Sequence, residues 1–417
     1  MSAPKPVVVK PGERFNPFTA AFRANPYRYY RHFRAIEPVH WGLSANTQAE
    51  GTWYLFRHAE VMAALKDRRL GREAERVLPP GERHPIPHSA RIFSDMYRKW
   101  MVFRDPPDHT RLRALVQKAF TARVIDALQP RIEQIAHELL DRMQGSSRMD
   151  FIGQFAFPLP VIVIAELLGV PASDRDRFRT WSTAISTANL LRRDSDEASY
   201  QDAVRATGAL QEYLGGIIEA RRRRPRADLI SGLISAVDEG STLSYEEMIA
   251  TSILILTAGH ETTVNLLGKG MLALLRNPAQ LEWLRKHPAA MPNAVLELLR
   301  YDSPVQIITR YAMDDIEYGG KHIPRGQTLG LALASANRDP EAFVDAETLD
   351  LSRDVRRHLS FGMGIHYCLG AALAQREGQV AFRVLLERMP GLALEDAPLQ
   401  WGEGIVFHGL THLPLRL

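Results

Sequence analysis

Phe361-Gly362-Met363-Gly364-Ile365-His366-Tyr367-Cys368-Leu369-Gly370 is the stretch that decides the fold of this chain, and it holds the only cysteine among 417 residues. A disulfide within the chain needs a second thiol, so Cys368 is a free thiol, a nucleophile or a metal ligand. The three glycines permit unusual backbone angles and let a flat partner approach the main chain closely. A helix predicted from Leu369 to Leu386 places Cys368 at a helix N-terminus, where the dipole favours a thiolate.

Without context, a lone cysteine is better interpreted as a buried residue that acts as a small hydrophobic side chain. The spacing of the residues around Cys368 argues against that interpretation here. Three glycines at these places would arise by chance about once in three thousand starting positions at ~7% glycine usage. The stretch resembles the haem-binding signature of the cytochrome P450 family, F-G-x-G-x-H-x-C-x-G, at every fixed position. The resemblance implies that Cys368 is the axial thiolate of haem iron, that Phe361 and Gly362 line the cofactor site, and that His366 contacts a haem propionate.

Composition excludes several classes of protein. Apolar residues make up 45% and charged residues 24% of the chain, as in ordinary globular proteins with a large core. The net charge of +4 is mild and the chain lacks concentrated basic tracts, so we expect no nucleic-acid binding; an acidic protein partner would suit it. No run of 18 apolar residues and no apolar signal core are present, which predicts a cytoplasmic protein without membrane contact.

The order of elements predicts one mainly helical domain with a smaller β-rich lobe, the α+β architecture of the cytochrome P450 fold that the motif resembles. We expect residues 1–25 to be irregular and residues 26–417 to form this single domain. Residues 71–100 hold four prolines and are interpreted as a long loop, which in a compact domain tends to be functional. In the resembled family this loop and the segment 184–191 border the substrate pocket, which makes candidates of Ile86, Ile92, Phe93 and Met96.

A second motif, Asp105-Pro106-Pro107-Asp108-His109-Thr110-Arg111-Leu112-Arg113, opens a helix with the prolines and acids typical of helix starts. His109 and Arg113 share one face of that helix, which on sequence alone is equally consistent with a solvated basic face. The pattern resembles the family's propionate-binding helix, and haem carboxylates need cationic partners when buried. By the same resemblance Arg310 is the other propionate arginine, and His358 lies near the same carboxylates.

The central helix is predicted from the capping box Ser244-x-x-Glu247 to about Leu275. Within it Ala258-Gly259-His260-Glu261-Thr262-Thr263 interrupts an apolar run, and a carboxylate there costs several kcal/mol unless it is hydrogen-bonded or solvated. Glu261 could be a buried salt-bridge partner, and Thr262 could bond back to the preceding turn. The hexapeptide resembles the family's oxygen-activation motif, which implies that Glu261 and Thr262 relay protons during oxygen activation and that Ala258 leaves room beside the iron.

The remaining motifs follow in the family's order. Glu297, Arg300 and Arg353 would form a buried charge network beneath the haem, in which one carboxylate satisfies two guanidinium groups. The resemblance also suggests a set of substrate-facing residues, which comprises Ile92, Phe93, Leu254, Ala258, Val305, Ile307, Ile308, Ile405 and Phe407. These side chains predict an apolar substrate of medium to large size.

The function implied is a haem-thiolate monooxygenase that inserts one oxygen atom from O2 into an apolar small molecule, by hydroxylation or epoxidation, as in secondary metabolism. The cofactor is haem b, and the electrons would come from a separate ferredoxin and ferredoxin reductase. A docking patch is suggested by five basic residues, namely Arg111, Lys118, Arg356, Arg357 and Arg376. Two alternatives stay open: a haem-thiolate peroxygenase or rearrangement enzyme, and a non-catalytic haem-based sensor or carrier.

Overall fold

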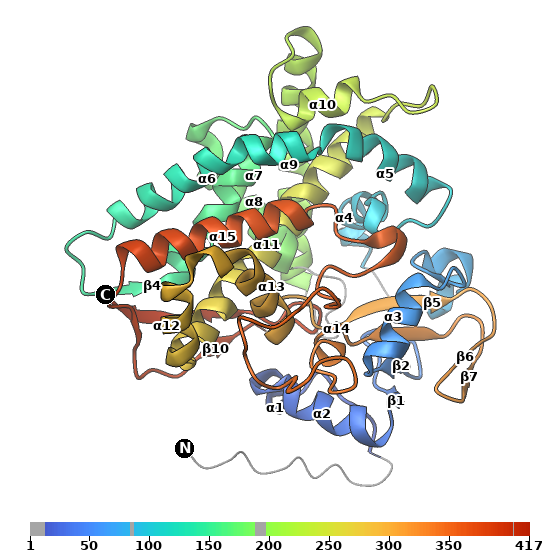
Figure 1. Ribbon diagram of the computed structural model, residues 1–417. Coiled ribbons are helices and arrows are strands. Elements are labelled where there is room, and N and C mark those ends of the chain that lie inside the picture. Colours follow the sequence, from blue (N-terminus) through green and yellow to red (C-terminus); the bar gives the residue numbers. More distant parts are fainter. Residues whose placement is uncertain (1–12, 84–86, 188–196, 403) are drawn as a thin grey trace.

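The protein divides into a large helical region and a smaller lobe built on β-strands (Figure 1). A computed structural model describes residues 13–83, 87–187, 197–402 and 404–417. Its helices are α1 Ala20–Ala24, α2 Pro26–Ile36, α3 His58–Lys66, α4 Arg91–Arg98, α5 Asp108–Ala119, α6 Ala122–Asp141, α7 Pro158–Leu167, α8 Arg175–Thr187, α9 Glu197–Arg223, α10 Leu229–Ser235, α11 Tyr245–Arg276, α12 Pro278–Lys286, α13 Met291–Tyr301, α14 Leu333–Ala336 and α15 Ala371–Arg388. Its strands are β1 Val39–Gly42, β2 Thr52–Leu55, β3 Leu70–Gly71, β4 Arg148–Asp150, β5 Ile308–Ala312, β6 Ile316–Tyr318, β7 Lys321–Ile323, β8 Thr328–Leu331, β9 Ala393–Leu394, β10 Gln400–Trp401, β11 Leu410–His412 and β12 Pro414–Arg416.

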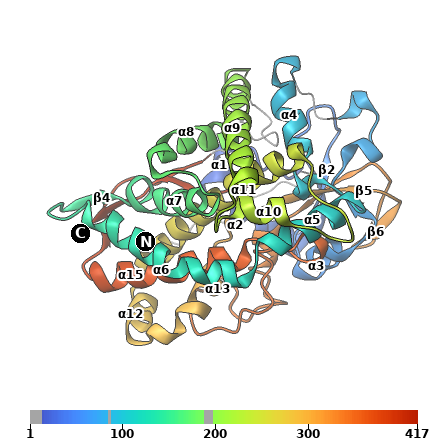
Figure 2. The same ribbon diagram turned by 90° about the horizontal axis from the view of Figure 1, so that it is seen from above.

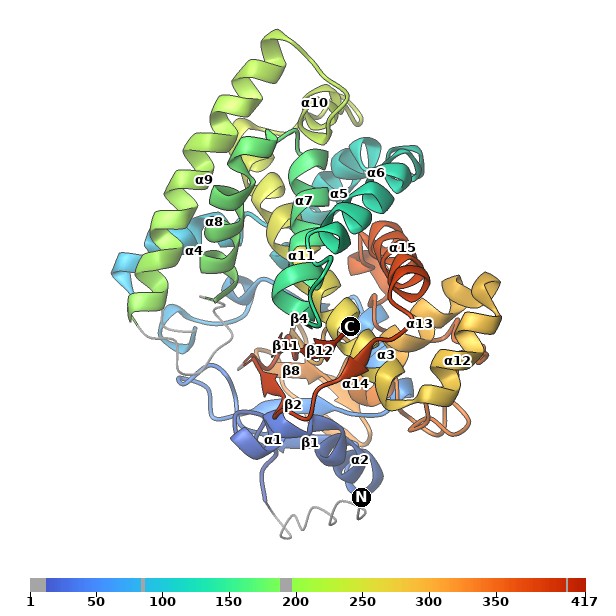
Figure 3. The same cartoon turned by 90° about the vertical axis from the view of Figure 1, so that its left-hand side faces the viewer.

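Helix α11 is the axis of the helical region, as Figures 2 and 3 show from two directions. Ser244 and Glu247 form both hydrogen bonds of the predicted capping box, and the helix continues for 32 residues to Arg276. At 1.5 Å per residue this is about 48 Å, enough to cross the molecule. Helices α7, α13 and α15 pack against it, so most of its side chains are buried. The sequence prediction of a central apolar helix is confirmed.

The main sheet holds five strands in the order β1-β2-β8-β5-β3. The predicted hairpin of β1 and β2 is present, with Val39 opposite Leu55. Strand β2 pairs in parallel with β8, and β8 pairs antiparallel with β5, which places Arg310 opposite Leu329. Because side chains alternate along a strand, Arg310 and Ala312 of β5 are buried while their neighbours are only partly covered.

Two predictions about irregular segments are wrong. Residues 13–25 are ordered: Thr19 caps α1, and Phe15 lies in an aromatic cluster where its ring centroid is 5.1 Å from that of Phe56. Residues 71–100 contain α4 and three short 3₁₀ turns, because Phe93 and Met96 are three apart and bury one helical face against α9. Pro80 begins one of these turns and Pro87 directly precedes another, and helix α4 follows them. Residues 1–12, Ile86 and residues 188–191 of the roof segment lie outside the described residues.

The described residues contain no helix with the length and apolar character needed to cross a bilayer.

Candidate active site

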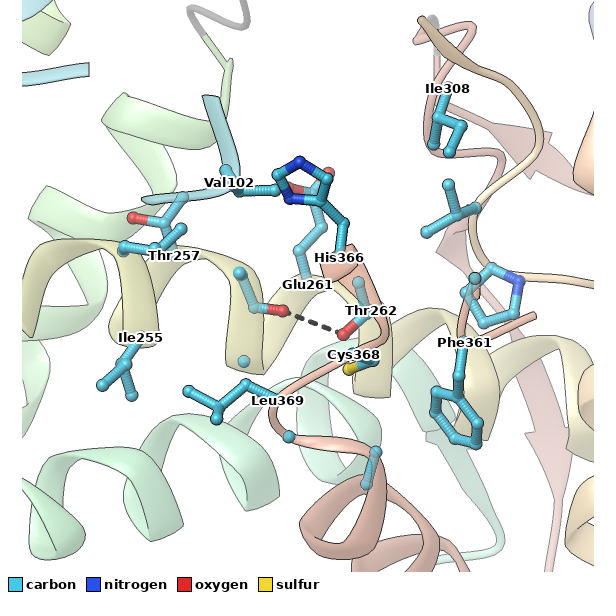
Figure 4. Close-up of a pocket in the computed structure, with 18 of the residues that line it drawn as sticks. Val102, Ile255, Thr257, Glu261, Thr262, Ile308, Phe361, His366, Cys368 and Leu369 are labelled. Atoms are coloured by element: carbon cyan, nitrogen blue, oxygen red, sulfur yellow. Dashed lines mark hydrogen bonds between the residues drawn. The ribbon is translucent and has the colours of Figure 1, made fainter. Parts of the chain in front are cut away.

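A cavity of about 370 Å³ lies between α11 and the loop that precedes α15. One wall comes from α11, with Leu254, Ala258 and Thr262, and the facing wall comes from Phe361, Gly362 and Cys368. Figure 4 shows Glu261 and Thr262 on the helix and the Cys368 sulfur on the loop, bordering the same pocket. Two motifs about 100 residues apart in sequence therefore face one space.

Cys368 is held at the cavity wall by its backbone. Its N–H donates to Phe361 O at 2.9 Å, which closes the loop, and Gly370 is the N-cap of α15. Burial raises the pKa of the Cys368 thiol, while the Gly370 N–H and the Arg113 guanidinium lower it. The helix N-terminus that is predicted to favour the thiolate is present. Its effect on the pKa is smaller than that of burial, so the thiolate needs a positively charged partner at the sulfur. Gly362 and Gly364 have φ of 68° and 71°, and a Cβ at Gly364 would lie 2.6 Å from Leu65 O.

The rim of the cavity is lined with basic side chains. Arg113 Nη2 donates to Tyr367 O at 2.6 Å, and the His109 and His366 rings lie 4.2 Å apart between centroids. Burial first, and then Arg113, lower the pKa of His109 to about 4. The pKa of Arg310 falls to about 9 because of burial and of a second guanidinium, Arg72. The structure thus brings together four predicted propionate ligands and adds a fifth basic residue that the motifs did not indicate.

Glu261 and Thr262 lie on the cavity side of α11. Burial raises the pKa of Glu261 to about 7, with Ser186 of α8 acting in the opposite direction. Thr262 Oγ1 donates to Ala258 O at 2.9 Å, the bond to the preceding turn that the sequence left as a possibility. His260, in contrast, is turned away from the cavity, where its Nδ1 lies 2.9 Å from Leu256 O and 3.0 Å from Ser182 Oγ.

Sequence reasoning missed Glu377 on α15. Its side chain is buried and lines the cavity, and Thr263 Oγ1 lies 3.3 Å from its Oε2. Burial raises its pKa to about 8, so the carboxyl is mostly protonated at neutral pH. The sequence could have indicated Glu377 by its position, because it lies four residues from both Leu373 and Ala381 on the apolar face of the predicted helix.

The predicted substrate residues divide into two groups. Leu254, Ala258, Val305, Ile308 and Phe407 line the cavity. Ile92, Phe93, Ile307 and Ile405 do not line it, and those four predictions are wrong.

The reasons differ from residue to residue. Ile92 is 54% exposed on the outer side of α4, and Phe93 is buried on the face that packs on α9. Ile307 precedes Ile308 and points the opposite way, into the aromatic cluster around Phe15. Ile405 is buried outside the cavity, whose lining from this turn is Val406 and Phe407.

The predicted charge network lies beside the cavity rather than in it. Arg300 donates twice to Glu297, at 2.6 and 2.8 Å, and Arg353 Nε donates to the same carboxylate at 3.3 Å. The backbone N–H of Asp350 adds a bond of 2.9 Å. His358 is in the same region, where burial first and then Arg300 lower its pKa to about 4. The centroid of its ring lies 5.6 Å from that of Phe361, and the residue does not line the cavity.

Most of the proposed docking patch is already neutralised by neighbouring acids. Arg111 pairs with Glu247, and three further ion pairs join Lys118 to Asp238, Arg356 to Asp354 and Arg376 to Asp126. Arg357 is exposed and has no ion pair among the described residues.

Comparisons with known proteins agree with this geometry. The family model described as Cytochrome P450 matches residues 189–390. The polyketide biosynthesis cytochrome P450 PksS of Bacillus subtilis is 41% identical, over 97% of this chain and 98% of the relative. The 6-deoxyerythronolide B hydroxylase of Saccharopolyspora erythraea is 38% identical, over 95% of this chain and 97% of the relative.

A solved structure of P450BioI in complex with acyl carrier protein carrying hexadec-9Z-enoic acid superposes with a TM-score of 0.87. It is 36% identical and covers 96% of this chain and 100% of that chain. The predicted fold is confirmed, and the resemblance first carried by one decapeptide extends over nearly the whole sequence. The chain therefore belongs to the cytochrome P450 family and is an enzyme of its bacterial monooxygenase type.

Proposed function

We propose that this enzyme binds haem b through the Cys368 thiolate and inserts one oxygen atom from O2 into an apolar small molecule, by hydroxylation or epoxidation. The observation that carries the proposal is the shared cavity, which has a thiol on one wall, a carboxyl and a hydroxyl on the other, and basic side chains at its rim. A ferredoxin and its reductase would supply the electrons.

The residues fit this cofactor. A thiol facing the cavity is a soft ligand suited to iron, and buried guanidinium and imidazole groups at the rim match two carboxylates. Burial lowers the pKa values of Arg113 and Arg310, and such anions would stabilise the charged form of both guanidinium groups. When bound, haem supplies the redox chemistry, and the protein sets its environment, its proton supply and the substrate's orientation.

Side chains of the central helix α11 would transfer the protons. Glu261, with a pKa near 7, is close to evenly divided between its two protonation states at neutral pH, the condition under which general acid–base catalysis is most effective. Thr262 gives its hydrogen to Ala258 O, so it donates toward the cavity only after that bond opens. Until then its oxygen can only accept hydrogen bonds from donors in the cavity.

The substrate side of the cavity is apolar. Leu254, Val305, Ile308 and Phe407 meet there, and the aromatic side chains of Tyr97 and Phe103 extend the wall. This lining favours a molecule that buries hydrocarbon against it, at about 25 cal/mol for each Å² removed from water. The names of PksS and 6-deoxyerythronolide B hydroxylase and the fatty-acyl ligand of the P450BioI complex support polyketide-like or acyl compounds of secondary metabolism as the first class to test.

The decisive experiment combines spectroscopy with reconstitution. The ferrous–CO complex should show the red-shifted Soret band of a thiolate-ligated haem, and macrolactones or long-chain acyl compounds should shift the ferric enzyme from low to high spin. A shifting compound should then be oxygenated with NADPH, ferredoxin and reductase. Equal turnover with hydrogen peroxide alone would instead favour a peroxygenase, and spin-shifting ligands that are never oxidised would favour a sensor or carrier.

A further inference from the structure

Arg72 is a partly buried arginine that no motif singled out. It directly follows β3 and lines the cavity, and its backbone N–H is anchored by Asp105 at 2.9 Å. Its Nε donates to Val102 O at 3.0 Å, and Nη1 donates to Thr309 O and, at 3.2 Å, to Thr309 Oγ1. The guanidinium lies 4.8 Å over the ring of Phe103. One side chain therefore joins the segment before α5 to strand β5.

A second guanidinium reaches the same carbonyl. Arg310 Nη1 donates to Thr309 O at 2.9 Å, so Arg72 and Arg310 converge on one oxygen atom. Arg310 is buried and Arg72 is partly buried, so their like charges repel, and a neutral carbonyl shared between them does not remove the repulsion. Each guanidinium carries five N–H donors, and among the described residues the Nη2 group of neither arginine makes a hydrogen bond.

The nearest acid does not neutralise this pair. Asp105 is buried, and both of its oxygens accept backbone N–H groups, from Arg72 at 2.9 Å and from Glu73 at 3.0 Å. Its side chain also lies 4.0 Å from Arg76. The carboxylate therefore orders the backbone at residues 72 and 73 and leaves the side chains of Arg72 and Arg310 facing the cavity with excess positive charge.

We propose that Arg72 and Arg310 clamp one carboxylate of the haem between them, which makes Arg72 a cofactor ligand. The Arg72 bonds to Val102 and Thr309 also hold the pocket wall at Val102 and Phe103 in place, so that cofactor binding fixes a surface the substrate touches. The inference rests on the proposed haem site and adds to it a residue from a different segment of the chain.

The test uses purified holoenzyme and the variants R72Q and R72K, with R69Q as the matched control. Arg69 is three residues away, is exposed and pairs with Asp67 outside the cavity. Haem loss is followed by transfer to an excess of apomyoglobin, and the midpoint potential by anaerobic redox titration. We expect R72Q to lose haem at least tenfold faster and to show a lower midpoint potential, because a positive charge near the haem edge stabilises the reduced state.

R72K keeps the charge but cannot bridge Val102 and Thr309 while also clamping a carboxylate. It should keep the parent's potential and lose haem several-fold faster, and R69Q should match the parent in both measurements. Haem loss from R72Q and R72K at the parent's rate would overturn the proposal. Faster haem loss from both variants with no shift of midpoint potential in R72Q would also overturn it, because that result means that Arg72 only holds the protein structure together. If R72Q does not fold, haem loss from R72K at the parent's rate still overturns the proposal.

The outcome is separable from that of the proposed function. A parent enzyme without the red-shifted ferrous–CO band would overturn the haem-thiolate site itself. A parent with that band and an R72Q variant indistinguishable from it would overturn only the role given to Arg72.

Discussion

The charge network at Glu297 and the rim of the cavity are two buried, arginine-rich regions with opposite electrostatics. In the network Arg300 gives two hydrogen bonds to Glu297 and further bonds to the carbonyl oxygens of Asn337, Ala346 and Thr348. At the rim Arg72 and Arg310 share one carbonyl, and burial and neighbouring cations lower the pKa of His366 to about 2. Buried charge that is satisfied internally supports the fold, and buried charge left unsatisfied indicates where a ligand belongs.

The largest effect should follow from removing the Cys368 sulfur, which lines the same cavity as Glu261 and Thr262. Cys368→Ala deletes the proposed iron ligand while leaving the rim cations in place. We expect complete loss of the red-shifted ferrous–CO band, because no other side chain supplies a thiolate in this chain. The measurement is the reduced CO difference spectrum of freshly purified protein. A retained band would refute the ligand assignment, and a circular dichroism spectrum like the parent's would show that the fold survived.

Breaking the satisfied network should cost stability. Glu297→Ala leaves the buried Arg300 and the partly buried Arg353 without their carboxylate, and stranding a buried charge costs about 3–5 kcal/mol. Urea unfolding of the holoenzyme should show this loss. Glu138→Ala is the matched control: its partner Arg131 is part-exposed, and such pairs contribute at most about 1 kcal/mol. Equal losses in the two variants would contradict the view that burial makes the Glu297 network strong.

Glu377 shows a third way in which the fold accommodates a buried ionisable group, because its carboxyl stays protonated and neutral. Its pKa in the folded protein is about 8, above its ordinary value of 4.5, so its contribution to stability is complete below pH 4.5 and is lost as the pH rises through 8. Relative to Glu377→Gln, the parent should therefore lose on the order of a few kcal/mol of unfolding free energy between pH 5 and pH 8.5. Urea midpoints at both pH values measure this. A difference between the two proteins that does not change with pH would show that the acid is already ionised in the fold.

The rim should behave in the opposite way to the network. Arg310→Gln removes an uncompensated cation, so the unfolding free energy of haem-free protein should stay the same or rise, whereas Glu297→Ala lowers it. Haem retention should weaken by about tenfold, which corresponds to ~1.4 kcal/mol. Apomyoglobin capture and urea unfolding give the two values. Loss of haem-free stability in Arg310→Gln would mean that the rim cations serve the fold after all.

Sequence motifs located the parts of this site that are contiguous in the chain. The decapeptide around Cys368, the hexapeptide around Glu261 and the helix start at His109 each carry their own local pattern, and all three converge on the cavity. Arg72 carries no such pattern, because its partner Thr309 is 237 residues away and the contact depends on β3 pairing with β5.

The errors have the same origin. Ile307 and Ile308 are equivalent in a sequence, and only the position of β5 in the sheet decides which of the two faces the cavity. The four prolines that precede Phe93 predict a pocket loop, whereas its segment packs against α9 as a helix. Tertiary contacts override local propensity at these places.

The smallest effect extends the comparison to the surface, where Arg356 and Arg357 are neighbours with different partners. Arg356 donates to Asp354 at 2.6 Å, whereas Arg357 has no ion pair among the described residues. If an acidic ferredoxin docks here, Arg357→Ala should raise its apparent KM several-fold at low salt, and Arg356→Ala should change it less, because Arg356 must first leave Asp354. The measurement is NADPH-driven turnover at increasing ferredoxin concentration. The Debye screening length shortens as the salt concentration rises, so the difference in KM between the two variants should disappear near ~0.5 M salt. Equal KM values for the two variants at every salt concentration would place the docking surface elsewhere.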